Sequence, residues 1–80
     1  MDQLSVMSIR LNDRDDIAPQ VQEILTQNGD LILGRFGIHD PGETNHGLIT
    51  LNLRGDMQRI QKMTEELKKL KGVQVNHMQA

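Results

Sequence analysis

The sequence contains no cysteine among its 80 residues. This absence excludes disulfide bonds, which often stabilise small domains, and it excludes thiolate-bound metals and iron–sulfur clusters. Because disulfides are rare in reducing compartments, a chain without cysteine fits a cytoplasmic location. Tryptophan and tyrosine are also absent, and Phe36 is the only aromatic residue. A hydrophobic core must therefore be built from leucine, isoleucine, valine and methionine.

An excess of positive charge and a long apolar segment are lacking as well. The formal net charge is −2, whereas a protein that binds nucleic acid by itself typically presents a basic face. No apolar run approaches the roughly 20 residues of a membrane-spanning helix, and the first residues lack the basic segment of a secretion signal. We therefore expect a single domain of residues 1–80 that binds neither nucleic acid by itself nor a membrane.

The most informative stretch is residues 31–54, in which two apolar-rich runs flank a polar loop. The runs cover residues 31–38 and 48–53, and glycine and proline interrupt the loop of residues 39–47 between them. This arrangement predicts two antiparallel strands joined as a hairpin. Two of the three histidines lie in the loop, so the hairpin also holds much of the unusual chemistry of the chain.

Before the hairpin, the chain shows one strand pattern and one helix pattern. Apolar residues at every second position predict a strand at residues 4–11. Helical spacing then predicts a helix that begins near Ile17 and ends at the Asn28-Gly29 pair. Pro19 fits the first turn of that helix, because the backbone N–H that proline lacks would have no helical partner there.

After the hairpin, the order is helix and then strand. Asp56 is a good N-cap for a helix that stops at Gly72, and residues 73–78 alternate as a short last strand. The whole order is strand, helix, strand, strand, helix, strand, which predicts the α+β, ferredoxin-like βαββαβ fold. Right-handed crossovers give one antiparallel four-stranded sheet in the order 4-1-3-2, with both helices on one face.

The alternation of the strands and the apolar stripes of the helices also predict the core. One face of the sheet packs against one stripe of each helix. The expected core residues are Met7, Ile9, Leu11, Ile49, Leu51, Leu53, Val73 and Val75 from the strands and Val21, Ile24, Leu25, Ile60, Met63, Leu67 and Leu70 from the helices.

The opposite face of the predicted sheet has no helix to cover it, yet apolar side chains are expected there. Burying such side chains against another copy is favourable, and a small domain with a modest core gains stability from the contact. We therefore expect a homodimer or homotetramer joined through sheet faces or edge strands. The apolar residues expected on this face or at its margins are Leu4, Val6, Leu31, Leu33 and Leu48.

The polar residues argue against several functions that this fold supports elsewhere. RNA-binding domains of this topology stack bases on aromatic residues of the middle strands, whereas this sequence has Arg10, Thr50 and Asn52 there. Acylphosphatases hold phosphate on the loop after the first strand, but the acidic residues 12–16 would repel an anion. No serine–histidine–aspartate set or close carboxylate pair stands out. We expect no enzymatic activity.

Segments spread between Ile17 and Val75 resemble a known family. They are Val21-Gln22-Glu23-Ile24-Leu25, Gly29, Leu31-Ile32-Leu33-Gly34-Arg35, Gly47-Leu48-Ile49 and Gly72-Val73. These segments are similar to those of the proposed regulators of the iron-only hydrogenase system, which are small, stand-alone ACT-like proteins. The matching positions are mostly structural glycines and core residues. The resemblance implies an ACT-like domain with a regulatory role, and it implies no particular cofactor.

ACT domains generally pair their sheets and bind a small effector, often an amino acid, at the interface. The resemblance thus implies a module that self-associates and binds a small molecule. Amino-acid-binding members carry a turn of small residues such as Pro-Gly after the first strand, where this chain has Asp13-Arg14-Asp15. The candidate effector and interface residues are Asn12, Asp13, Arg14, Arg35 and Gly37.

The hairpin loop leaves a second hypothesis open, namely a metal sensor. Its imidazole and carboxylate groups suit zinc, nickel or non-haem iron. The region also resembles, more loosely, the ACT-like C-terminal domain of nickel-responsive repressors, in which only His39 matches a ligand position. An exposed polar turn is the alternative interpretation, because Asp-Pro-Gly is a typical turn sequence. The candidate metal ligands are His39, Asp40, Glu43 and His46.

Overall fold

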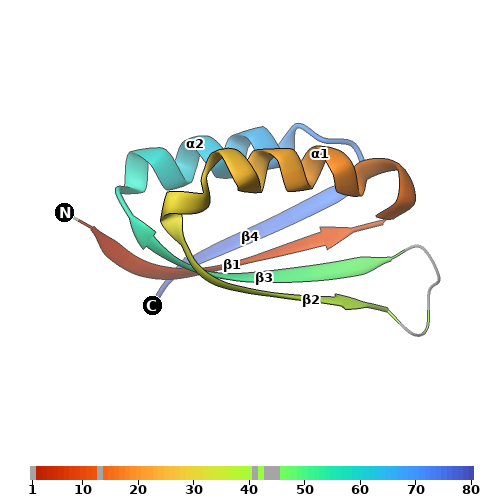
Figure 1. Cartoon of the computed structure of the whole chain (residues 1–80), viewed down its shortest axis with the longest axis horizontal. Helices are drawn as coiled ribbons and strands as arrows, with labels where there is room; N and C mark the ends of the chain where they lie inside the picture. Colours follow the sequence, from red (N-terminus) through yellow and green to blue (C-terminus); the bar gives the residue numbers. More distant parts are fainter. Residues whose placement is uncertain (1, 13, 41, 43–45) are drawn as a thin grey trace.

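Two helices lie on one side of a single sheet, and the other side of the sheet is uncovered (Figure 1). The computed structural model describes residues 2–12, 14–40, 42 and 46–80, apart from the side chains of Arg14 and Asp15. In chain order the elements are strand β1 (Gln3–Leu11), helix α1 (Arg14–Gln27), the short 3₁₀ helix η1 (Gly29–Leu31), strands β2 (Ile32–His39) and β3 (Gly47–Gly55), helix α2 (Met57–Lys68) and strand β4 (Val73–Gln79).

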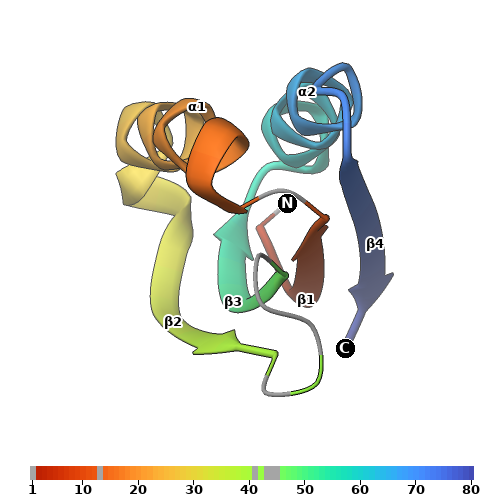
Figure 2. The ribbon, with the colours of Figure 1, turned by 90° about the vertical axis from the view of Figure 1, so that its right-hand side faces the viewer.

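The sheet has the strand order β2-β3-β1-β4 and is antiparallel throughout. The predicted ferredoxin-like topology is therefore confirmed. Figure 2 shows β2 and β4 at the two edges of the sheet and the two helices side by side above it. Met7 lies opposite Leu51 and Ile9 lies opposite Ile49, so the apolar residues of the two central strands share the face under the helices.

Helix α1 begins at Arg14, which is earlier than the apolar spacing predicts. Pro19 therefore lies inside the helix and not in its first turn, and the Asp15 carbonyl cannot receive the hydrogen bond that residue 19 would otherwise donate. At the other end, Asn28 Nδ2 donates to the carbonyl oxygen of Ile24 at 2.8 Å. This bond satisfies one of the carbonyls that are left free where the helix ends.

Helix α2 has the N-cap that the sequence indicates. The Asp56 carboxylate accepts a hydrogen bond from the backbone N–H of Gln58 at 2.8 Å, which satisfies a donor left free in the first turn. After the helix, Gly72 adopts a φ of +81°, a left-handed backbone that residues with side chains rarely adopt. Neither of the helices among the described residues is long and apolar enough to cross a membrane.

The hydrophobic core lies between the sheet and the two helices. Ile24, Leu70 and Val73 are partly buried at its margin, and every other predicted core residue is buried. Ile17 and Leu31 are buried in addition. The core prediction from the sequence patterns is therefore confirmed and extended by two residues.

The expected position of Leu31 on the uncovered face is wrong. Leu31 belongs to η1, and it is only 3% exposed. Because η1 turns the chain before β2 begins, the alternation of the strand does not extend to this residue. Its side chain lies over Gly55, where a Cβ atom would collide with Leu31 Cδ2. Any side chain at position 55 therefore requires Leu31 to move.

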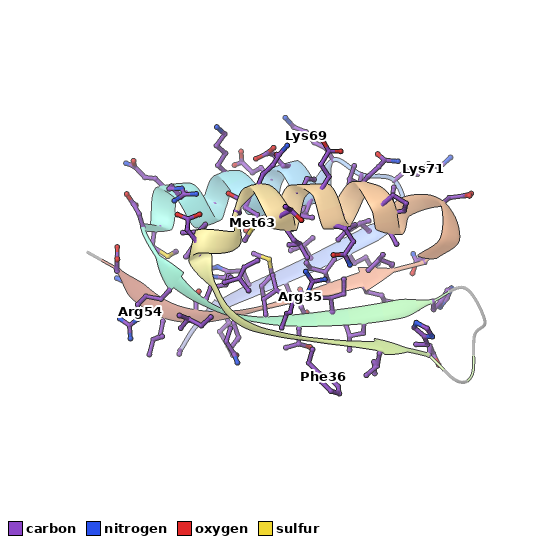
Figure 3. The ribbon with its side chains drawn as sticks, viewed as in Figure 1. Arg35, Phe36, Arg54, Met63, Lys69 and Lys71 are labelled. Carbon is purple, nitrogen blue, oxygen red and sulfur yellow. The ribbon has the colours of Figure 1, made fainter. Side chains whose placement is uncertain are left out.

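An irregularity at the start of β2 decides which of its residues face the helices. The pairing with β3 shifts register between Ile32 and Gly34. Beyond the shift, Arg35 lies opposite the buried Leu51. Figure 3 shows Arg35 directed toward the helices and Phe36 directed away from them. The only aromatic residue thus lies on the uncovered face, on the edge strand β2 and not on one of the two central strands.

An ion pair between Asp30 and Arg59 joins η1 to α2 at the surface. Arg59 Nη2 donates to Asp30 Oδ1 at 3.0 Å, and Arg59 Nη1 pairs with the second carboxylate oxygen. The hydrogen bonds from the Arg59 guanidinium lower the pKa of the Asp30 carboxyl from its ordinary value of 3.8. Both side chains are largely exposed, so solvent screens much of the attraction.

Asp30→Asn is expected to lower the melting temperature slightly at neutral pH and to leave it unchanged in strong acid. A carboxyl with a lowered folded-state pKa stabilises the fold above its unfolded-state pKa, and this contribution disappears as the pH falls through the folded-state pKa. Thermal unfolding near pH 7 and near pH 2 measures the difference. Asp2→Asn, at an exposed carboxylate outside the pair, is the control. An equal loss at both pH values would exclude the ion pair as the cause.

Candidate functional site

Two of the expected effector residues, Arg35 and Gly37, line one cavity between α1 and the β2–β3 hairpin. This helix-face cavity has a volume of about 280 Å³. Helix α1 contributes Ala18 and Gln22, and His39 contributes from the end of β2. The lining also includes Leu11, Ile38, Gly47, Leu48 and Ile49.

Arg35 supplies the positive charge of the helix-face cavity. Its Nη2 donates a hydrogen bond to Gln22 Oε1 at 2.7 Å, so α1 holds the guanidinium in position. Among the described residues, Arg35 has no carboxylate partner. The remaining N–H donors of the planar guanidinium are therefore free for an anion such as a carboxylate, which binds in a fork-like geometry.

Gly37 leaves space beside the guanidinium. A Cβ atom at this position would meet no described atom nearer than Ile49 Cγ1, at 3.9 Å. The backbone of Gly37 is not in the left-handed region, so a residue with a side chain fits here without strain. A large side chain at position 37 would consequently fill the cavity and leave the strand intact.

A second cavity of about 210 Å³ lies on the uncovered side of the hairpin and is termed the open-face cavity. The Asp40 N–H donates to the carbonyl oxygen of His46 at 3.1 Å, and Asp40 Oδ1 accepts from the N–H of Gly42 at 2.8 Å. The Nδ1 atom of His46 is buried, with no hydrogen-bond partner in the part of the chain that the structure describes. The lining consists of Arg10, Ile38, Asp40, His46, Gly47 and Leu48.

The structure brings two of the four predicted metal ligands into one cavity and places a third, His39, in the other. His39 lines the helix-face cavity, whereas Asp40 and His46 line the open-face cavity. The strand register explains this separation, because His39 lies opposite Gly47 and not opposite His46. Glu43 lies outside the described residues. Within residues 2–12, 14–40, 42 and 46–80, no group of three or more histidine, aspartate or glutamate side chains could hold a metal. The metal hypothesis therefore gains no support.

The remaining effector candidates do not line the helix-face cavity. The Asn12 N–H donates to the Gly72 carbonyl at 2.8 Å and thereby ties the end of β1 to the turn before β4. Asp13 and the side chain of Arg14 lie outside the described residues. Gln22 is not predicted as a site residue by any sequence pattern, because only the fold brings it beside Arg35, 13 positions away.

The uncovered face of the sheet carries exposed apolar side chains. Phe36 is 69% exposed and Met78 is 66% exposed. The expected exposure of Leu4 and Leu48 is confirmed. Val6 is half-buried, and Leu33 is exposed at the register shift of β2. We define the open-face patch as Leu4, Phe36, Ile38, Leu48 and Met78.

A family model matches almost the whole chain. It is described as "Iron-only hydrogenase system regulator, putative" (TM1266-like), and it covers residues 3–77. None of the curated proteins matches the sequence.

Solved structures with this fold include an uncharacterised protein and a domain of a larger enzyme. TM1266 from Thermotoga maritima shares 28% identity, with a TM-score of 0.90 over 99% of this chain and 98% of that one. The ACT domain of the GTP pyrophosphokinase of Chlorobium tepidum shares 16% identity, with a TM-score of 0.74 over 96% and 86% of the two chains.

A nitrogen regulatory PII-like protein is a more distant structural neighbour. It comes from Thiomonas intermedia K12 and was solved with ADP, AMP and bicarbonate bound. Its identity is 16% and its TM-score is 0.54, over 100% of this chain and 91% of that one. Identities this low show a shared fold only, and the ACT-like, ferredoxin-like fold class predicted from the sequence is confirmed.

Proposed function

The chain belongs to the TM1266-like family, which is described as "Iron-only hydrogenase system regulator, putative". On this premise we propose that it is a stand-alone ACT-like regulatory module without catalytic activity. The proposed domain comprises residues 1–80 and acts in the cytoplasm. It pairs with a second copy through the open-face patch and binds a small effector in the helix-face cavity. The ACT-like fold supports this role, because such modules regulate by binding and not by chemistry.

The observation that carries the proposal is the Arg35 guanidinium in the helix-face cavity. A cation that faces a partly apolar cavity without an opposite charge favours an anionic occupant. Gln22 holds the guanidinium in position. The lining is apolar apart from Gln22, Arg35 and His39, and this composition supports the binding of a small molecule.

Self-association is supported by the open-face patch. Exposed apolar patches on a small domain typically mark an interaction surface. Ser8, Thr50 and Asn52 stand between the patch residues, and the exposed Arg10 and Arg54 lie opposite Leu48 and Leu4 at the ends of the same face. The short uncharged side chains in the middle of the face allow two sheets to approach to roughly 10 Å. The molecule measures 40 × 20 × 17 Å. A face of such dimensions approaches the roughly 800 Å² that each partner buries in a standard interface.

Amide chemical shifts measured with butanoate, butylamine and butanamide test the effector site. We expect at least one of the three probes to shift the amides of Ala18, Gln22 and Gly37, because they surround the cavity. Gly37→Leu should abolish these shifts by filling the space. Gly34→Leu places the same side chain on the same strand, outside the cavity lining, and should leave them.

Two outcomes would contradict the effector site. If probes of all three charge types leave these amides unmoved, or if Gly34→Leu removes the shifts as completely as Gly37→Leu, the helix-face cavity is not a binding site.

A further inference from the structure

We propose that the ligand of the helix-face cavity is a short-chain carboxylic acid that lacks an α-amino group. The inference rests on the proposed function of this cavity and specifies the chemical class of its ligand. The carboxylate binds the guanidinium of Arg35, and the aliphatic chain lies along the apolar wall formed by Leu11, Ala18 and Ile49.

The carboxylate end follows from the geometry around Arg35. Its Nη2 already donates to Gln22 Oε1 at 2.7 Å, and this bond restricts the rotation of the guanidinium. A guanidinium has five N–H donors in a fixed fork, so donors remain for the two oxygens of a carboxylate. Because no described carboxylate of the chain pairs with Arg35, the ligand need not displace an existing partner.

The aliphatic end follows from the apolar part of the lining. Leu11 and Ile49 belong to the hydrophobic core, and Ala18 packs against it from α1. Each methylene that leaves water for such a wall strengthens binding by about fourfold. Affinity should therefore rise along the series from acetate to butanoate and stop rising once the chain outgrows the cavity.

The absence of an amino group follows from the charges of the lining. The described lining residues include no aspartate or glutamate, and the groups that carry or can gain charge are Arg35 and His39. The ammonium of an α-amino acid would lie close to the Arg35 guanidinium, with no carboxylate in the described lining to pair with, and such an approach of like charges is unfavourable. The cavity should thus discriminate against amino acids.

Three probes of matched size test the inference: 4-methylpentanoate, leucine and 4-methylpentanamide. Leucine adds an α-ammonium to the first probe, and the amide removes its charge. Titrations followed by amide chemical shifts of Ala18, Gly37 and Ile49 give the dissociation constants. We expect 4-methylpentanoate to bind at least about tenfold more tightly than either of the others, because a charged partner strengthens a hydrogen bond markedly. Arg35→Gln should abolish its advantage over the amide.

The possible results distinguish a failure of the proposed ligand class from a failure of the proposed effector site. Leucine binding as tightly as 4-methylpentanoate overturns the exclusion of amino acids, and amide binding as tight as the acid overturns the role of the carboxylate. Both results leave the cavity as an effector site. If none of the three probes, nor butylamine, shifts the cavity amides, the proposed function fails together with the inference. Arg35→Lys, which keeps the charge but loses the fork, should retain part of the preference and controls for a folding defect in Arg35→Gln.

Discussion

Leu51→Ala is expected to lower the free energy of unfolding by about 2–5 kcal/mol, the range for truncating a buried leucine. Leu51 is fully buried on β3, one of the two central strands, and lies opposite Met7 of β1. Its truncation leaves a cavity under the helices that the rigid sheet cannot close. Urea denaturation at a fixed protein concentration measures the loss, since self-association would make the stability depend on concentration.

Thr26→Ala is the control, because Thr26 is exposed on α1, away from both the core and the open-face patch. Its effect should stay within about 0.5 kcal/mol, as for most surface substitutions. A loss near zero for Leu51→Ala, or losses of equal size for both variants, would contradict the assignment of the buried face of β3.

Phe36→Lys is expected to raise the dissociation constant of the dimer by at least about 100-fold. Burying a phenylalanine side chain contributes about 1.5–3 kcal/mol, and in a two-fold symmetric dimer the substitution alters the interface twice. Sedimentation equilibrium measures the dissociation constant. Phe36 is mostly exposed within one chain, so the fold of the single copy should be unaffected and its secondary structure should be unchanged.

Thr26→Lys adds the same charge at an exposed position of α1, and it should leave the dissociation constant unchanged. A stable monomer of the unsubstituted protein at high micromolar concentration would contradict self-association altogether. A dimer that survives Phe36→Lys would instead exclude the open-face patch and point to the edge strands β2 and β4.

The fold could be predicted because the helices bury only one face of the sheet, so that core residues recur at every second position of a strand. In β1 and β3, buried residues alternate with half-buried or exposed ones. Most of this alternation is visible in the sequence, and the stripe of α2 points to the same core. The buried position of Leu31 could not be predicted in this way, because η1 interrupts the alternation just before β2. The face of Phe36 could not be predicted from alternation, because the register shift between Ile32 and Gly34 changes the face on which the later residues of β2 lie.

The candidate site could be predicted only in part. Arg35 and Gly37 were expected from a family resemblance, but nothing in the local sequence shows that Gln22 lies within hydrogen-bond distance of Arg35. The two loop histidines suggested a joint site because they are close in sequence. His39 pairs with Gly47, so His46 is not the residue opposite His39 in the hairpin. This register is determined by the pairing of the whole hairpin and not by the loop residues.

The β2–β3 hairpin is a single layer with a cavity on each side, and Ile38 and Leu48 line both. The same two residues belong to the open-face patch, so a ligand that displaces them from one side changes the surface that a second copy meets on the other. Thermodynamic linkage then requires reciprocity: a ligand that tightens the dimer by a given factor must itself bind the dimer more tightly by that factor. The coupling that the proposed function implies would need neither a hinge nor a long pathway, because both cavities are lined by the same strand pair.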